Sequence, residues 1–327
     1  MKKKKNIYIP LIALGSVVVT VLSLQGALNL LKFAIYRDYY AIEKSVCKIP
    51  GIDDKFVMQG LTLLDDEKEV IAIGGYTSNN KASRIYITNP NNEVRCITFK
   101  ENGEPFLGHS GGIAYSGSTF YLANGDGEGA GVYMLDASKI LDKNVTELEL
   151  DPSNTFKRVN GSASFVYADD KYLYIGEFNY GSTYVTNHPL VTRSGKEHKA
   201  IVRKYDLSDT ELSSPLCYYS IPDKVQGFAI GKNDDLILST SYGLASSYYY
   251  VYKNDDIYLS DTKIDGVDTY VLDDPYLSLK APAMSEDLDF NPLNNRLYTV
   301  TESASSKYIF GKFFNAYDVN SLGLYDE

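Results

Sequence analysis

Three residues of this 327-residue chain have side chains and surroundings suited to acid–base chemistry. Glu177 follows the apolar run YLYIG, where a carboxylate is costly to bury unless it is paired or hydrogen-bonded. Glu286 is the first residue of the acidic segment EDLD, and a further acid, Glu302, follows in the same last repeat of the chain. His109 lies in the glycine-rich segment GHSGG. Neighbouring acids can raise one pKa and leave another group ionised, as general acid–base catalysis requires. We therefore predict Glu177, Glu286 and His109 as the catalytic residues of an enzyme.

The same acids are candidate ligands for a metal ion. Ca²⁺ binds six to eight oxygen atoms from carboxylate and amide groups, so Glu177, Glu286 and Asn124 form a candidate site for a divalent cation such as Ca²⁺. The segment NGDGEG that begins at Asn124 lacks the alternating ligands and the downstream glutamate of an EF-hand loop. The alternative is that these acids accept hydrogen bonds from backbone amides. His188 and His198 lie in a polar insertion and are expected to be exposed.

Charge and cysteine content exclude two classes of protein. The chain has 32 basic and 42 acidic residues, and five of the basic residues precede residue 37, so residues 37–327 carry 27 minus 42, or −15. Such an acidic surface does not suit nucleic-acid binding, which needs basic residues against the phosphates. Three cysteines cannot build a disulfide scaffold.

The elements that must position these side chains form a repeat. Five segments begin with a small or polar residue and continue as an apolar stretch, and their second positions are residues 60, 112, 164, 227 and 287. A second β-rich run starts 7–10 residues after each of these positions, which is a hairpin distance. Further runs supply third and fourth strands, with ELEL from Glu147 expected in the second repeat and TYVL from Thr269 in the fourth. Five such units predict an all-β, five-bladed β-propeller, with an open β-sandwich as the alternative.

One further similarity predicts how the ring closes. The segment VCKIPGIDDKFVMQG from Val46 is similar to LCYYSIPDKVQG from Leu216, which supplies an outer strand and leads into the next blade. Residues 46–49 should therefore be the outer strand of the last blade, whose own repeat has little sequence left for a fourth strand. An N-terminal strand in this place leaves no open sheet edge.

In a propeller, the inner strand of each blade starts at the face where the second strand ends. The polar residues at these positions should therefore surround one mouth of the central channel, and converging polar groups in a pocket are typical of a binding site. We predict five substrate-binding residues there, namely Gln59, Gln226, Tyr76, Tyr242 and Ser164.

The N-terminal residues have the pattern of a signal anchor. A cluster of lysines at positions 2–5 precedes 26 uncharged residues, 6–31, which is long enough for one transmembrane helix. The lysines should stay in the cytoplasm, so that a bacterial cell membrane would hold the propeller on its outer side. We predict an anchor over residues 1–36, a helical stalk over 37–44 and the propeller over 45–327. If the anchor segment is cleaved, the propeller is secreted.

The segment FVMQGL from Phe56, followed by IAIGGYTSNNKASRIYI from Ile71, resembles the opening blade of the plant-type glutamine cyclotransferases. A second stretch, Gln226-Gly227-Phe228 with STSYGLASSYYYVY from Ser239, has the same character. The resemblance implies a five-bladed propeller that cyclises N-terminal glutamine, although Gly75-Tyr76-Thr77-Ser78 lacks the glutamate that this family has there. More loosely, the chain resembles secreted bacterial propellers of the lactonase type, which bind a metal through acids and asparagines.

The sequence leaves several functions open. The first is an extracellular enzyme that binds a small molecule or peptide and hydrolyses it with metal assistance. The second is a non-catalytic module that binds an envelope protein or serves as a scaffold, and the third is a glutaminyl-cyclase-like acyltransferase. A glycosidase with central acids is a further alternative, but the chain has no tryptophan to stack against a sugar.

Overall fold

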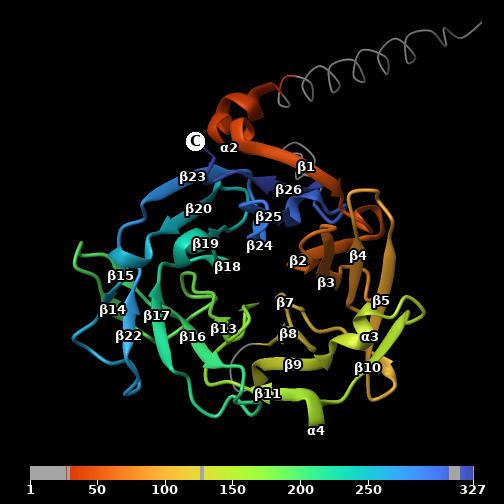
Figure 1. Ribbon diagram of the computed structural model, residues 1–327, viewed down its shortest axis with the longest axis horizontal. Helices are drawn as coiled ribbons and strands as arrows, with labels where there is room; N and C mark the ends of the chain where they lie inside the picture. Colours follow the sequence, from red (N-terminus) through yellow and green to blue (C-terminus); the bar gives the residue numbers. More distant parts are fainter. Residues whose placement is uncertain (1–26, 28–29, 126–128, 309–316, 327) are drawn as a thin grey trace, which may run out of the picture.

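A computed structural model describes residues 27, 30–125, 129–308 and 317–326. In this part of the chain, five sheets of four or six strands surround one axis, and a separate two-stranded sheet joins β14 (Leu190–Val191) to β15 (Glu197–His198). Figure 1 shows the blades following one another around the ring in sequence order. The prediction of an all-β, five-bladed β-propeller is therefore confirmed.

The repeated apolar segments form the inner and second strands of the blades. The inner strands are β2 (Phe56–Asp65), β7 (Gly112–Ser116), β12 (Phe165–Ala168), β18 (Val225–Ile230) and β24 (Ser285–Asn291). The second strands are β3 (Val70–Thr77), β8 (Thr119–Asn124), β13 (Tyr172–Gly176), β19 (Leu236–Thr240) and β25 (Arg296–Thr301). Most of their side chains are buried because blades pack face to face on both sides.

Two further strands complete each blade toward the rim. The third strands are β4 (Arg84–Thr88), β9 (Gly131–Asp136), β16 (Ala200–Asp206), β20 (Ser247–Tyr252) and β26 (Asp318–Leu322). The outer strands are β5 (Arg95–Glu101), β11 (Phe156–Arg158), β17 (Cys217–Ile221), β23 (Leu277–Ala281) and β1 (Glu43–Lys48). Smaller elements at the rim are β6 (Glu104–Pro105), α3 (Ala137–Leu141) and α4 (Pro152–Thr155).

The N-terminal strand closes the ring, as the sequence predicts. Strand β1 pairs antiparallel with β26, with Glu43 opposite Leu322 and Lys48 opposite Asp318. The Lys48 Nζ atom lies 2.6 Å from an oxygen of Asp318. The last blade thus takes its outer strand from the start of the propeller and its other strands from the end, which removes an open edge.

Two strands pair with a different blade from the one that the sequence predicts. Strand β10 (Glu147–Leu150), expected in the second blade, runs parallel to β5 of the first blade. Strand β22 (Thr269–Val271), expected in the fourth, runs parallel to β17 of the third blade and pairs with β21 (Tyr258–Leu259). These predictions were wrong because a short amphipathic strand shows its type in the sequence but not its partner.

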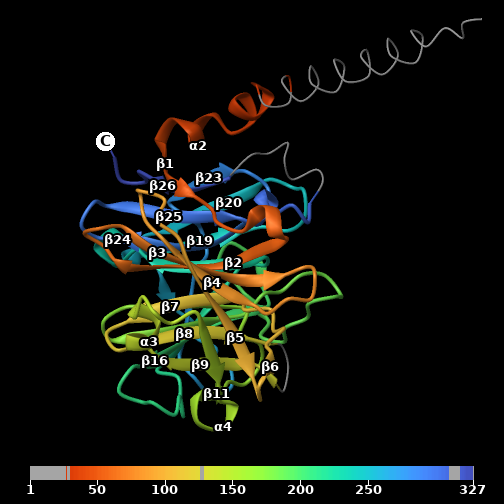
Figure 2. The same cartoon turned by 90° about the vertical axis from the view of Figure 1, so that its right-hand side faces the viewer.

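The segment predicted as a stalk forms helix α2 (Arg37–Ile42), which packs against the propeller rather than standing apart from it. Figures 1 and 2 show α2 at the rim beside β23 and β1. Tyr39 is only 1% exposed, and its ring stacks on Tyr249 of the fourth blade with the centroids 6.4 Å apart. Its hydroxyl accepts a hydrogen bond of 3.0 Å from Asn320 of the fifth blade. Tyr39 therefore links the fourth blade to the fifth, the blade in which the ring closes.

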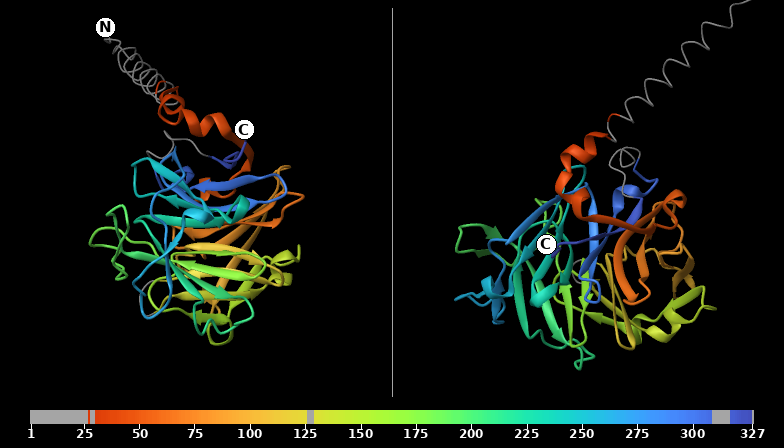
Figure 3. Two further views of the ribbon diagram at one scale, coloured as in Figure 1. Left: turned by 60° about the vertical axis from the view of Figure 1, so that its left-hand side comes forward. Right: turned by 45° about the horizontal axis from the view of Figure 1, so that its top comes forward.

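The end of α2 is also tied to the C-terminal part of the chain, which Figure 3 shows beside it. The Ile42 carbonyl oxygen accepts hydrogen bonds from Gly323 N at 3.1 Å and Arg296 Nη2 at 2.8 Å. None of the described helices is both long and apolar enough to span a membrane. The predicted transmembrane segment, residues 6–31, lies almost entirely outside the described residues.

Replacing Tyr39 by phenylalanine is expected to lower the free energy of unfolding by about 1–2 kcal/mol, because the buried Asn320 amide loses its acceptor. Urea unfolding followed by circular dichroism measures this change. Tyr40→Phe is the matched control, since the buried Tyr40 hydroxyl makes no hydrogen bond with any described residue. Equal effects of the two substitutions would show that the contact with Asn320 does not stabilise closure.

Candidate functional site

A cavity of about 560 Å³ lies where the inner strands of the five blades begin. Seven residues that the sequence predicts at this mouth line it together: Gln59, Tyr76, His109, Ser164, Gln226, Tyr242 and Glu286. Glu302 lines it as well. The repeat positions thus bring to one place side chains that are more than 200 residues apart in sequence.

A turn that recurs before the inner strands holds the cavity wall in place. Met284 precedes β24 and has a φ of +63°, and its carbonyl oxygen accepts a hydrogen bond of 2.8 Å from Glu302 N. Lys224 precedes β18 with a φ of +68° and accepts a hydrogen bond of 2.9 Å from Ser241 N. Each turn ties the end of a second strand to the start of its inner strand. Left-handed backbone at a residue other than glycine is costly and is often found at functional sites.

Two carboxyl groups face each other in the fifth-blade part of the cavity. Glu286, from the inner strand, is 2% exposed. Burial raises the pKa of Glu286 well above its usual range, and the neighbouring carboxylates of Glu302 and Asp287 and a hydrogen bond with Glu302 raise it further. Burial also raises the pKa of Glu302, while the hydroxyl of Tyr308 and the charge of Lys307 oppose this shift. The pKa values of both glutamates are thus raised, and the hydrogen bond between them favours the proton on Glu286 with Glu302 as the acceptor.

Aromatic and basic groups surround this pair. Tyr308 donates a hydrogen bond from its hydroxyl to Glu302 Oε1, and Lys307 Nζ donates one to the hydroxyl of Tyr76. The ring of Tyr76 stacks on His109, with centroids 4.7 Å apart and an interplanar angle of 29°. Tyr76 thus lies between His109 and Lys307, and His109 is part of the cavity lining that a ligand can reach.

Stability should report the proton on Glu286 directly. Because its pKa is higher in the folded than in the unfolded protein, the folded state keeps a proton that the unfolded state loses near pH 4, and stability falls as pH rises above that value. Glu286→Gln removes this loss. We expect this variant to match the wild type near pH 4 and to be more stable by about 1–3 kcal/mol at pH 7–8.

Thermal unfolding at the two pH values measures the difference between the proteins. The exposed residue Glu104 supplies the matched control, Glu104→Gln. A stability difference between Glu286→Gln and the wild type that does not change between pH 4 and pH 8 would mean that Glu286 has an ordinary pKa.

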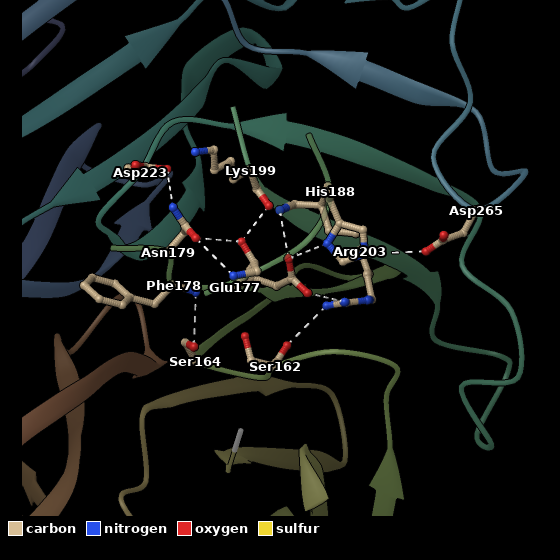
Figure 4. Close-up of polar contacts among 12 residues, drawn as sticks. Ser162, Ser164, Glu177, Phe178, Asn179, His188, Lys199, Arg203, Asp223 and Asp265 are labelled. Atoms are coloured by element: carbon tan, nitrogen blue, oxygen red, sulfur yellow. Dashed lines mark hydrogen bonds and ion pairs between the residues drawn. The ribbon is translucent and has the colours of Figure 1, made fainter. Parts of the chain in front are cut away.

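Glu177 does not line the cavity, contrary to expectation, and instead contacts Arg203 and His188 (Figure 4). Its backbone N–H donates to Ile201 O at 3.1 Å, and a carboxylate oxygen accepts from Ile201 N at 3.3 Å, so the side chain lies against β16 while the next residue, Phe178, lines the cavity. The Glu177 carboxylate is 1% exposed and contacts both Arg203 and His188, the latter at 2.8 Å. A charged group can be buried in this place because it is paired.

The pKa of Glu177 reflects this pairing. Burial by itself raises the pKa, but the hydrogen bond with His188 and the charge of Arg203 outweigh burial, so the pKa lies below its usual range. Glu177 thus stays ionised and held by its partners. The expectation that His188 and His198 are exposed was wrong. His188 lies between Glu177 and Asp265 and contacts both, and His198 is 2% exposed.

The metal site predicted from Glu177, Glu286 and Asn124 does not assemble. Asn124 does not line the cavity, and its side-chain oxygen packs beside Gly108, where an added Cβ would lie 2.5 Å from it. Within the described ranges, no three or more His, Cys, Asp or Glu side chains are grouped so that they could hold a metal ion.

Sequence reasoning missed Lys307, Tyr308, Phe178 and Tyr184, all of which line the cavity. The first two follow the 3₁₀ turn of Glu302–Ala304 after the end of β25. Their position after a second strand is the signal that could have identified them, because second strands end at the mouth. Tyr184 comes from an insertion that the repeat pattern does not describe.

No family model and no curated protein matches the chain. Among solved structures it is similar to the glutaminyl cyclase of Myxococcus xanthus, over 79% of this chain and 91% of that chain, with 8% identity and a TM-score of 0.43. It is also similar to the PQQ-bound aldose sugar dehydrogenase of Streptomyces coelicolor, over 80% and 77% of the two chains, with 12% identity and a TM-score of 0.42. A glutaminyl cyclase is thus among the similar structures, as the sequence resemblance predicted. At these identities the likeness is one of fold.

Proposed function

We propose that the axial cavity binds the amino end of a peptide, or a small molecule that carries a primary amine. The observation that supports this most is the interacting pair formed by the buried Glu286 and the half-buried Glu302. Two carboxylates in a cavity repel each other unless they share a proton or face a cation. A ligand ammonium group can replace that shared proton, so the pair gains a counterion when the ligand binds.

The rest of the cavity suits such a ligand. Its volume of about 560 Å³ is in the range of small-molecule sites. Gln59, Gln226 and Ser164, from three different blades, offer hydrogen-bonding groups in the cavity lining, which can bind the peptide groups next to the amino end. Lys307 donates a hydrogen bond to the hydroxyl of Tyr76, and its charge offsets part of the negative charge of the carboxyl pair.

Thermal shift with two peptides tests the proposal. Gly-Ala-Ala should raise the melting temperature as its concentration rises, as a ligand of the folded state does, whereas N-acetyl-Gly-Ala-Ala should not. The shift should be retained in Glu104→Gln and lost in Glu302→Gln. Equal shifts with the two peptides, or no shift at millimolar concentration with either, would contradict the proposal.

A second candidate function is the cyclisation of N-terminal glutamine. The stretch Gln59-Gly60-Leu61 supports it, because Gln59 lines the cavity, and the glutamate missing after Gly75 has a counterpart in Glu302, at the end of a second strand in another blade. In this reaction the α-amino nitrogen attacks the side-chain amide carbon, a C–N bond forms, and ammonia leaves. The carboxyl pair would accept the proton of the amine and return it to the leaving nitrogen.

Ammonia release from Gln-Ala-Ala distinguishes this enzyme from a binding module. Release that is lost in both Glu302→Gln and Glu286→Gln would support cyclisation. Binding without release would instead make the propeller a recognition module for amino ends, such as those of envelope proteins.

We also propose that residues 6–31 anchor the protein in the cell membrane with the propeller outside. The lysine cluster followed by an uncharged run supports this orientation. Membrane fractionation of the full chain, with protease added to intact cells, tests it. A protein found in the washed membrane fraction and cleaved from outside supports the proposal, and one found only in the cytoplasmic fraction contradicts it.

A further inference from the structure

A group of aromatic side chains forms the wall of the cavity on the side of the third and fourth blades. Phe178, Tyr184 and Tyr242 all line the cavity, and the Tyr242 side chain is 39% exposed. Tyr242 packs on Tyr180 with centroids 3.9 Å apart, and on Phe178 with centroids 6.3 Å apart and an interplanar angle of 29°. Below we call these four residues, Phe178, Tyr180, Tyr184 and Tyr242, the aromatic wall.

Most of the aromatic wall belongs to one loop, residues 178–187, whose base is firmly held. Glu177, at its start, contacts His188, at its end, at 2.8 Å. Within the loop, Asn179 Oδ1 accepts a hydrogen bond of 3.0 Å from Thr186 N, and Asn179 Nδ2 donates one of 2.7 Å to Asp223. These contacts fix the loop to the third blade and to the turn before the fourth (Figure 4). The wall is therefore preformed, and ligand binding does not have to order it.

The wall and the acidic pair occupy different blades of one cavity. Glu286 and Glu302 come from the fifth blade, and the aromatic wall comes from the third and fourth. A ligand whose charged end lies at the acidic pair and that is large enough to fill the cavity therefore extends toward the aromatic wall. Exposed aromatic rings favour stacking on another ring over contact with water.

We propose that the aromatic wall is a second subsite, which selects ligands whose second residue has an aromatic side chain. The inference rests on the proposed function, because it takes the amino end to lie at the acidic pair. Tyr242 is the specificity-determining residue, since its ring lines the cavity and the other three rings of the wall all pack against it. Glu177 and His188 are positioning residues that hold the loop carrying the wall.

Isothermal titration with Gly-Phe-Ala and Gly-Ala-Ala tests this subsite. We expect the wild type to bind Gly-Phe-Ala about 3- to 10-fold more tightly, as one additional aromatic contact implies. In Tyr242→Ala the ratio of the two affinities should fall to about 1, and a circular dichroism spectrum like that of the wild type shows that the variant is folded. In Tyr242→Phe the preference should be kept, because the ring remains.

The possible failures are distinct. If Gly-Ala-Ala binds but Gly-Phe-Ala gains nothing, or if Tyr242→Ala keeps the preference, the subsite is overturned and the proposed function stands. If neither peptide binds the wild type, the proposed function fails and the subsite is overturned with it. His188→Ala should reduce the preference without changing the affinity for Gly-Ala-Ala, and a preference equal to that of the wild type would overturn the positioning role.

Discussion

Replacing Arg203 by methionine is expected to lower the free energy of unfolding by about 3–5 kcal/mol, the usual cost of removing one partner from a buried ion pair. Arg203 is 1% exposed, and its guanidinium contacts Glu177 and donates a hydrogen bond of 3.2 Å to Ser162 O. Methionine is similar in length to arginine but has no charge, so the buried Glu177 carboxylate loses its ion pair with the guanidinium group. Urea unfolding followed by circular dichroism measures the loss.

Two further variants make this result interpretable. Lys68→Met removes one partner of the exposed ion pair with Asp65 and should change stability little, because solvent screens such pairs. The double variant Arg203→Met with Glu177→Met removes both charges, and we expect it to be more stable than Arg203→Met alone. A loss in Arg203→Met no larger than that in Lys68→Met would mean that this network does not stabilise the blade.

Glu302→Gln is expected to weaken the binding of Gly-Ala-Ala by about 30-fold or more, because a buried charge pair that loses one partner costs at least 2 kcal/mol. The amide keeps the shape of the carboxyl group but cannot balance a ligand ammonium. Glu286→Gln should weaken binding less, since Glu286 holds the proton in the free protein and an amide resembles that neutral form. Isothermal titration at pH 7 measures both, with Glu104→Gln as the control. Equal losses in the two variants would contradict the assignment of the proton to Glu286.

Much of the fold and of the cavity could be predicted from the sequence because both follow the repeat. The inner strands begin at equivalent positions, so Gln59, Ser164, Gln226 and Glu286 could be assigned to one mouth without knowing any distance. The similarity between the segments at Val46 and Leu216 likewise predicted that β1 closes the last blade. Repeated position in the chain becomes repeated position in space, and in the fourth and fifth blades the same left-handed turn precedes the inner strand.

The rest depends on contacts that no repeat contains. Glu177 ends a second strand like Glu302, but Arg203 on the neighbouring strand and His188 in an insertion draw it away from the mouth. The sequences of β10 and β22 have the pattern of a strand, but they do not indicate which blade each strand joins. The docking of Tyr39 between two blades depends on Tyr249 and Asn320, which lie more than 200 residues further along the chain.

The number of protons released when a peptide binds tests the central claim most directly. Titration of the wild type with Gly-Ala-Ala at pH 6, in two buffers with different ionisation enthalpies, measures it. If the ligand ammonium replaces the proton shared by Glu286 and Glu302, about one proton should leave for each peptide bound, and Glu286→Gln should release none. Binding without proton release, or equally strong binding of N-acetyl-Gly-Ala-Ala, would contradict the account.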